Sequence, residues 1–301
     1  MSRILFWLLI LLGLGACQAG RQDQEYLPHY TKAPPGGERE YVFGVHPLHN
    51  PERLYEMFGP IMDYLAERIP GSHFRLEASR NYAAFEEKLY GREFDFALPN
   101  PYQTVLALSH GYRVFGKMAD DENFRGIILL RKDSPVKAVA DLKGKAVSFP
   151  APTALAATLL PQFFLHTHGL DVSRDIELRY VGSQESSIMN VYLGNVAAGA
   201  TWPPPWRAYI REHPEVGAAV RVMWETESLP NNSLMARDDI PQDLVATVKG
   251  LLVEMHGTEQ GRLNLERMAL SRFESADGDT YVPVREFLDR FERAVRPLGR
   301  P

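Results

Sequence analysis

Cysteine is nearly absent from this sequence: among 301 residues there is one, Cys17. A single cysteine excludes an internal disulfide framework and a zinc site built on several cysteines. An excess of positive charge is missing too, because 33 Lys and Arg residues stand against 38 Asp and Glu residues. The formal net charge of −5 does not predict a surface that binds nucleic acid.

Sequence motifs of catalysis are also missing. There is no G-x-S-x-G, no H-E-x-x-H, no P-loop and no glycine set for a dinucleotide. No pair of carboxylates is singled out for acid and base chemistry. Catalytic groups can come together from distant positions, so this lack argues against an enzyme without excluding one. We expect a protein that binds a molecule without converting it, and we expect no cofactor and no metal.

Long apolar runs are confined to the N-terminus. Residues 4–14 form one after Arg3, and about eleven residues are too few to span a bilayer, which takes about 20. Leu-Gly-Ala-Cys follows at positions 14–17, an order that resembles the site at which a bacterial lipoprotein is cleaved and acylated. We expect residues 1–16 to be a signal peptide and Cys17 to carry a lipid. A plain signal peptide with a chance cysteine is the alternative.

A segment without apolar periodicity follows the cysteine. Residues 17–38 include two prolines and two glycines at positions 34–37, which predicts an extended tether. About twenty residues at ~3.3 Å each reach roughly 65 Å. The lipidated tether would therefore hold a folded body near a membrane but outside it.

The rest of the chain alternates short apolar runs with amphipathic segments. Asn50-Pro51-Glu52 supplies an N-cap, a proline at the first helical position and an acid in the first turn. Apolar residues then recur at helical spacing from Leu54 to Ile69. Strands are predicted at 41–45, 94–98, 112–118, 126–131, 146–149, 176–181, 196–201, 220–224 and 233–236. Helices are predicted at 51–69, 81–90, 101–109, 154–168, 185–193, after the prolines at 203–205, and at 241–256, 259–271 and 283–295.

This alternation predicts an α/β fold with parallel sheets covered by helices. Two lobes with a cleft between them are the economical arrangement for a chain of this length. We expect a discontinuous first lobe, residues 39–130 plus 230–301, and an inserted second lobe, residues 131–229. Ligands of such sheets bind at the carboxyl ends of the strands.

Several short motifs occur in order over residues 40–290. They are Gly91–Ala97 with Asn100-Pro101-Tyr102, Asp141–Lys145 followed by Ser148-Phe149, Leu160-Pro161, Gly182-Ser183, Gly194 with Ala198–Ala200, and Ser228–Pro230. In this order the sequence resembles the periplasmic solute-binding proteins of phosphate, phosphite and phosphonate ABC transporters. The resemblance implies the type II periplasmic binding fold: a two-lobed clamp, each lobe a mostly parallel sheet covered by helices, with a hinge of crossing strands.

The resemblance also implies where an anion would bind. Members of that family open the helix after the strand at 146–149 with a hydroxyl-rich loop, whose hydroxyls and backbone N–H groups hold an oxyanion. Here the loop positions are Ala154, Leu155, Ala156 and Ala157, with Thr153 and Thr158 as the nearby hydroxyls. The family's His-Asp pair corresponds to Gln184-Glu185, and a later Asp corresponds to Ala197. Because each lost charge-assisted bond is worth about 1.5–3 kcal/mol, we expect a ligand other than a simple phosphonate.

Aromatic residues offer another kind of wall. Tyr82 and Tyr102 flank strand ends of the first lobe, and Trp202 and Trp206 bracket three prolines in the second. Such a wall suits a flat, cationic or largely apolar solute; aromatic packing between the lobes is the alternative.

The expected ligand-binding residues are His46, Tyr82, Asn100, Tyr102, Thr153, Gln184, Glu185 and Trp202. A ferric-ion site from His46, His49 and these tyrosines with Glu185 is a lesser alternative.

The predicted function is capture of a small molecule for an ABC-type uptake system, with a permease as partner. We expect a monomer, lipid-anchored at the periplasmic side of a bacterial cell membrane, in the inner or the outer membrane. Two alternatives stay open at this point: a ligand-binding partner of a membrane sensor, and a carrier of an apolar or lipid molecule between membranes. A third, an enzyme built on the same clamp, has the least support.

Overall fold

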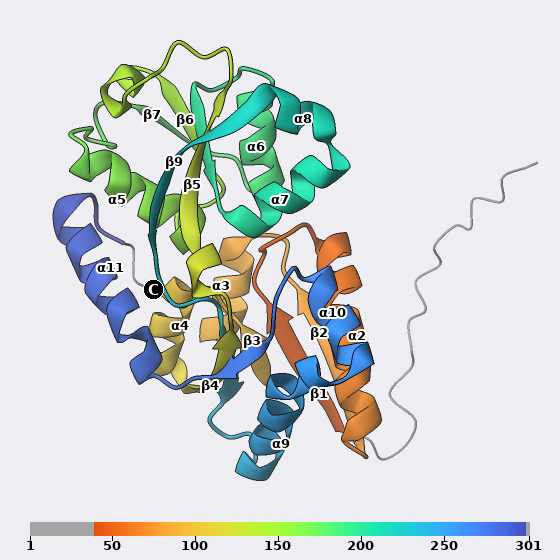
Figure 1. Cartoon of the computed structure of the whole chain (residues 1–301). Helices are drawn as coiled ribbons and strands as arrows, with labels where there is room; N and C mark the ends of the chain where they lie inside the picture. The colour runs from red at the N-terminus through yellow and green to blue at the C-terminus, as the bar shows by residue number, and fades with distance from the viewer. Residues whose placement is uncertain (1–38, 299–301) are drawn as a thin grey trace, which may run out of the picture. The chain divides into compact units, whose positions relative to one another are not determined.

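The computed structural model describes residues 39–298. The predicted signal peptide, the lipid on Cys17 and the whole tether lie outside the described residues. In the described part, no helix combines the length and the apolar character that crossing a membrane requires. The α/β class is confirmed, because two separate sheets, each covered by helices, make up this part of the chain (Figure 1).

The first lobe is defined here as the six-stranded sheet and the helices that pack on it. Its strand order is β11-β4-β10-β3-β1-β2. The strands are β1 Arg39–Val45, β2 Ser72–Ala78, β3 Phe96–Leu98, β4 Tyr112–Met118, β10 Ser233–Arg237 and β11 Phe273–Ser275. The helices are α2 Pro51–Arg68, α3 Tyr82–Tyr90, α4 Pro101–Ala107, α9 Gln242–Val253, α10 Glu259–Arg267 and α11 Val282–Ala294.

The second lobe is the five-stranded sheet with its helices, in the order β7-β6-β8-β5-β9. The strands are β5 Arg125–Arg131, β6 Ala146–Phe149, β7 Glu177–Tyr180, β8 Ala198–Thr201 and β9 Val220–Ser228. The helices are α5 Leu160–Thr167, α6 Gln184–Tyr192, α7 Pro203–Glu212 and α8 Pro214–Ala219, with a π-helical turn, η4 Leu155–Leu159, directly before α5. The predicted lobe boundaries stay a prediction, although β5, assigned to the first lobe from the sequence, pairs in this second sheet.

Both sheets are mixed, where the sequence predicted mostly parallel ones. The ladders of β1 with β2 and β3, and of β6 with β7 and β8, are parallel. The antiparallel ladders involve β4, β10, β5 and β9, which carry the chain from one sheet to the other and back. A segment that leaves a sheet and a segment that returns to it run in opposite directions, so antiparallel neighbours follow from the double crossing.

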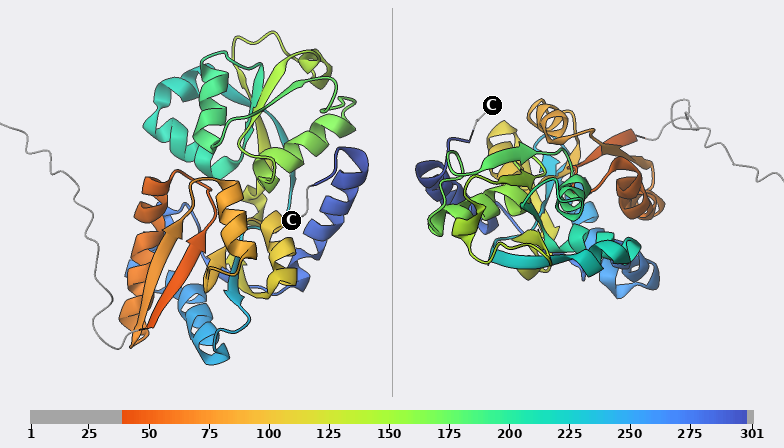
Figure 2. Two further views of the ribbon diagram at one scale, coloured as in Figure 1. Left: turned by 180° about the vertical axis from the view of Figure 1, so that it is seen from behind. Right: turned by 90° about the horizontal axis from the view of Figure 1, so that it is seen from above.

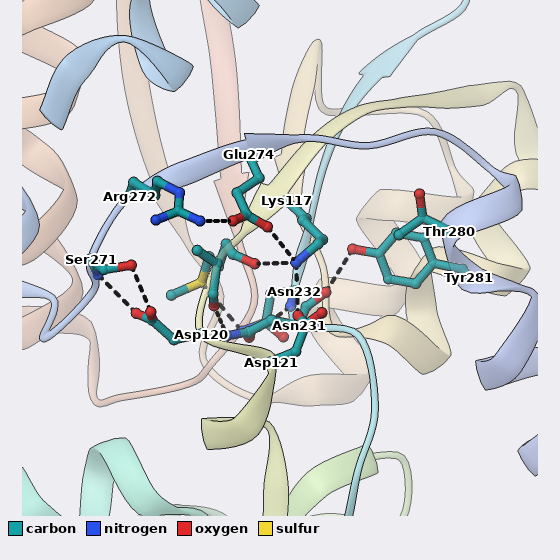
Figure 3. A network of polar contacts seen from close by, with 12 residues as sticks. Lys117, Asp120, Asp121, Asn231, Asn232, Ser271, Arg272, Glu274, Thr280 and Tyr281 are labelled. Atoms are coloured by element: carbon teal, nitrogen blue, oxygen red, sulfur yellow. Dashed lines mark hydrogen bonds and ion pairs between the residues drawn. The ribbon is translucent and has the colours of Figure 1, made fainter. Parts of the chain in front are cut away.

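The two crossing segments, residues 119–124 and 229–232, are held by a polar network at the edge of the first sheet (Figure 3). At its centre the buried Lys117 ammonium lies 2.8 Å from Asp121 Oδ1 and 3.1 Å from Glu274 Oε2. Asp121 accepts the backbone N–H of Asn231 at 2.9 Å, and the Tyr281 hydroxyl donates to the Asn231 carbonyl at 2.6 Å. Both crossings are thus tied to the C-terminal part of the first lobe.

Helix α11 provides another link between the lobes. It packs on α4 of the first lobe and on α5 of the second, as the opposite views of Figures 1 and 2 show. Just beyond its end, the Arg296 guanidinium donates to Gln162 Oε1 at 3.1 Å and to the Pro152 carbonyl at 2.8 Å. The C-terminal residues therefore reach across to the second lobe.

Most predicted elements are present, with two strands missed. β2 was not predicted because its only inward apolar residues are Phe74 and Leu76, between charged neighbours, and β11 has three residues. The N-cap at Asn50 is confirmed: its side chain accepts the Arg53 N–H, and α2 begins at Pro51. The helix predicted to follow the prolines at 203–205 begins at Pro203 instead, because proline fits the first turn, where no N–H is needed.

Candidate functional site

The carboxyl ends of strands from both sheets meet at one cavity. His46 follows β1 and Asn100 follows β3, while Trp202 follows β8 and Gln184 opens the helix after β7. The cavity is lined by His46, Tyr82, Asn100, Phe124, Ala154, Leu155, Ala156, Ala157, Gln184 and Trp202. The site thus lies where an α/β sheet is expected to bind its ligand, and both lobes contribute to it.

The cavity is almost filled by these side chains. The space open to the centre of a water molecule is about 10 Å³, which is about the room that one water needs. In this state the lobes are in contact with each other across the site. A solute of several heavy atoms can enter only if the lobes separate.

Five of the eight predicted site residues line this cavity: His46, Tyr82, Asn100, Gln184 and Trp202. Their role in binding stays a prediction. The other three lie beside it. Thr153 contacts Glu86 and Asn100, Glu185 contacts His49, and Tyr102 lines a separate groove between α4 and α11.

His46 is a neutral imidazole in this environment. Its Nδ1 lies 2.9 Å from the Leu98 carbonyl, which can only accept, so Nδ1 carries the proton and Nε2 presents a lone pair. Burial lowers the pKa of His46 to about 4; the bond to Leu98 opposes this shift and nearby His49 adds to it. At neutral pH the group can accept a hydrogen bond but offers no positive charge to a ligand.

Tyr82 and Gln184 form a polar pair across the two lobes. Burial raises the pKa of the Tyr82 hydroxyl, which is also hydrogen-bonded to Gln184. The Gln184 Oε1 atom also accepts the Thr201 hydroxyl at 2.7 Å. Both side chains are held in place without a ligand and remain uncharged.

The charge nearest to this pair is negative. His49 Nδ1 lies 3.8 Å from Glu185 Oε1, and burial lowers the pKa of His49, so it is neutral above the ordinary histidine range. Burial acts to raise the pKa of Glu185, but the contacts with His49, its own backbone N–H and Ser183 lower it overall. Glu185 is therefore ionised, and its buried Oε2 atom has no hydrogen-bond partner.

The loop at Ala154–Ala157 is apolar and buried on every side chain. It enters the π-helical turn η4, whose first N–H groups have no partner inside the helix. Of the two nearby hydroxyls, Thr153 donates to Glu86 and Thr158 Oγ1 is buried without a partner. Within residues 39–298, no Lys or Arg lines the cavity, so only backbone donors and polar neutral groups could meet an anion.

Sequence reasoning missed Phe124 and Glu86. Phe124 lies on a crossing segment and meets Trp202 edge to face at 5.6 Å between ring centroids; an isolated phenylalanine in a connection gives no sequence signal. Glu86 belongs to a Glu-Glu-Lys run typical of a solvated helix face, yet it is half-buried between the lobes. Trp206, expected to share an aromatic wall with Trp202, packs in the core of the second lobe instead.

Metal binding has no visible support in the described part of the chain. Among residues 39–298 there is no group of three or more His, Cys, Asp or Glu side chains placed to hold a metal ion. His46 and His49 are both directed into protein contacts, with the Leu98 carbonyl and with Glu185.

Comparison with known proteins gives a family and a fold. The model of a family described as the periplasmic substrate-binding protein of phosphonate ABC transporters matches residues 43–281. A binding protein component of an ABC phosphonate transporter from Pseudomonas aeruginosa is 15% identical, with 85% of this chain and 88% of that chain covered and a TM-score of 0.78.

Two further solved structures agree. PhnD1 from Prochlorococcus marinus, in complex with methylphosphonate, is 17% identical, with 84% and 98% of the two chains covered and a TM-score of 0.77. The aliphatic sulphonate binding protein SsuA from Escherichia coli is 19% identical, with 85% and 88% covered and a TM-score of 0.58. At these identities the likeness concerns the fold, and it confirms the predicted two-lobed periplasmic-binding-protein architecture.

Proposed function

Because this chain belongs to the family of periplasmic substrate-binding proteins of phosphonate ABC transporters, we propose that it captures one small molecule between its lobes and delivers it to an ABC permease. The family consists of substrate-binding components of transport systems, which agrees with the non-enzymatic, periplasmic protein expected from the sequence. The candidate solute site is the cavity at the strand ends, and closure of the lobes would make the form that docks on the permease.

One observation carries the choice of ligand: among residues 39–298 no Lys or Arg lines the cavity, and the ionised Glu185 directly follows Gln184, which does line it. An anion there would be repelled by Glu185, with no cation in the described cavity wall to offset the repulsion. We infer a small solute without net negative charge. Trp202 and Tyr82 supply flat apolar surfaces, and the Tyr82 hydroxyl and His46 Nε2 supply one donor and one acceptor.

Titration calorimetry with methylphosphonate tests this inference. We expect the unaltered full chain to bind it more weakly than about 100 μM, which corresponds to less than about 5.5 kcal/mol. The variant A154S/L155T/A156S/A157G rebuilds the hydroxyl loop and should gain at least tenfold, because each charge-assisted bond is worth about 1.5–3 kcal/mol. L155V is the matched control that keeps the loop apolar, and it should gain nothing. Micromolar binding by the unaltered chain would overturn the inference.

Native mass spectrometry of the full chain purified in detergent addresses the solute itself. Binding clamps can retain their ligand, and a neutral or cationic small molecule is the expected added mass. A retained phosphonate would contradict the proposed ligand class while leaving the transport function standing.

The anchor and the lobe boundaries remain proposals. We propose that Cys17 carries a lipid and that the body acts as a monomer at the periplasmic face of the membrane. Incorporation of labelled palmitate into the chain, and its loss in C17S, would test the anchor. No observation in the site favours the carrier alternative. Nothing in the site favours the sensor alternative over uptake.

A further inference from the structure

Three polar side chains and one backbone carbonyl join the lobes beside the cavity. Thr153 lies between β6 and η4 in the second lobe, while Glu86 is on α3 and Asn100 caps α4 in the first. The Thr153 hydroxyl donates to Glu86 Oε1 at 2.5 Å, and the Asn100 side-chain amide donates to the Thr153 carbonyl at 3.2 Å. We call this set the Glu86–Thr153–Asn100 latch.

The first-lobe half of the latch is held by hydrogen bonds within that lobe. Gln103 Nε2 donates to the same Glu86 Oε1 at 3.0 Å. Gln103 Oε1 accepts the Asn100 N–H at 3.0 Å, and Asn100 Oδ1 accepts the Gln103 N–H at 3.1 Å in a capping box. Glu86 and Asn100 are thus held ready for Thr153 by bonds that involve no solute.

An apolar seam runs next to the latch. Ala154–Ala157 and Trp202 of the second lobe share one buried cluster with Tyr82 and Tyr102 of the first. Phe124, on a crossing segment, belongs to the same cluster and packs against Trp202. These side chains remove apolar surface from water when the lobes come together. The two sides of the seam are already in contact, because the space open to the centre of a water molecule between them is about 10 Å³.

The ion pairs at the rim add little to this contact. Arg53 Nη1 lies 2.7 Å from Glu212 Oε1 across the lobes, but half of the Glu212 side chain is exposed. Exposed pairs of this kind contribute little to stability. The partly buried latch and the apolar seam hold the lobes together beside the cavity, next to the Tyr82–Gln184 and His49–Glu185 contacts.

We propose that this clamp closes on itself without a solute, held by the Glu86–Thr153–Asn100 latch and the apolar seam. The inference concerns the regulation of the proposed solute site, and it rests on the proposed function only for the identity of that site. A solute then competes with the protein's own contacts. Its apparent dissociation constant is the intrinsic one divided by the fraction of molecules that are open. Weakening the latch should accordingly improve solute binding.

Distances between two spin labels test the proposal on the full chain. Leu193 in the second lobe and Leu263 on α10 in the first are exposed, so C17S/L193C/L263C offers two labelling sites. The protein is unfolded, dialysed and refolded to remove any solute, and its mass confirms that it is empty. We expect one short distance in the empty protein. A predominantly long distance would overturn the proposal.

Matched threonine variants then isolate the latch. T153V removes the donor to Glu86 and should lower the closed-to-open ratio at least tenfold, visible as a second, longer distance. T158V removes a buried hydroxyl that has no partner among the described residues and should leave the distances unchanged.

E86A removes the acceptor of the same hydrogen bond from the other lobe. It should have the same effect as T153V, and it serves as the test if T153V fails to fold. If both single variants fold, the double variant should add nothing further. Equal behaviour of T153V and T158V contradicts the latch. No solute is added, so the outcome is independent of whether the proposed ligand is right.

Discussion

The network at the crossing segments and the cavity between the lobes are both buried, yet they treat charge differently. The crossing network encloses a cation: Lys117 is paired with Asp121 and Glu274 and also donates to the Met118 carbonyl at 3.3 Å. The cavity, within the described residues, has no cation at all. This fold can bury an ammonium group where the surroundings satisfy it, so the absence of one at the cavity is a property of the site. Charged groups hold the crossing segments, and neutral groups line the proposed solute site.

The largest expected effect comes from removing the cation of the crossing network. Lys117→Met removes the ammonium group that Asp121 and Glu274 share. The free energy of unfolding should fall by about 3 kcal/mol. This is the lower end of the cost of breaking a buried pair, because both carboxylates are partly exposed. Urea denaturation of the full chain measures it. Arg272→Met is the matched control, since Arg272 pairs with the same Glu274 from an exposed position and should cost less than about 1 kcal/mol. If Lys117→Met and Arg272→Met lower the free energy of unfolding equally, the crossing network does not depend on its buried cation.

On the cavity side the comparable test removes apolar volume. Leu155 is 1% exposed and belongs to the seam between the lobes. Leu155→Ala should lower the free energy of unfolding by about 2–3 kcal/mol, toward the lower end of such substitutions because the neighbouring loop can relax. Leu193→Ala, at a position that is 60% exposed, should change it by less than about 0.5 kcal/mol. A negligible effect of Leu155→Ala would show that the seam contributes nothing to the folded state.

Acid tests the cavity side of the comparison through its buried histidine. His46 has a pKa of about 4 in the folded chain, below its ordinary value of 6.5, so stability is complete above pH 6.5 and falls as the unfolded chain takes up a proton below it. Between pH 7 and pH 5.5 this should cost about 1 kcal/mol, with His49 shifting in the same direction. Burial raises the pKa of Glu86, so Glu86 acts in the opposite direction to His46 as the pH falls through that raised pKa toward the ordinary carboxyl range.

Urea midpoints at several pH values measure this loss, and His46→Gln should remove most of it. His256, exposed at the end of α9, is the control position: His256→Gln should leave the pH dependence intact. A pH profile that does not change in His46→Gln would mean that the cavity does not hold this histidine neutral.

The parts of the fold that sequence could predict are those governed by local rules. Asn50 before Pro51 predicted the start of α2 because cap chemistry is local. His46 and Trp202 were expected at the cavity because each directly follows a predicted strand; both line it, and their role in binding stays a prediction. Tyr102 also follows a strand end, yet it lines a groove away from the cavity. The direction of a side chain in the first helical turn depends on how the helix packs, and spacing does not give that.

Contacts between distant segments could not be predicted either. Glu86 looked like part of a solvated face, and only the approach of Thr153 from the other lobe buries it. Phe124 became part of the cavity because the crossing segments pass beside it, and the mixed sheets follow from the same crossings. β2 was lost because its outward residues His73, Arg75 and Glu77 are polar, although such alternation is what a strand with one solvated face requires.

The smallest effect has the opposite sign, and it bears on the cavity most directly. Thr158 is fully buried in η4, and its hydroxyl has no hydrogen-bond partner within the described residues. An unpartnered buried hydroxyl costs free energy, so Thr158→Val, of similar shape, should raise the free energy of unfolding by about 0.5–1 kcal/mol. Thr153→Val should lower it by at least as much, because that hydroxyl donates to Glu86. If Thr158→Val destabilises the chain instead, the hydroxyl has a partner in solution. A water would then reach this hydroxyl inside η4, directly behind the Ala154–Ala157 wall of the cavity.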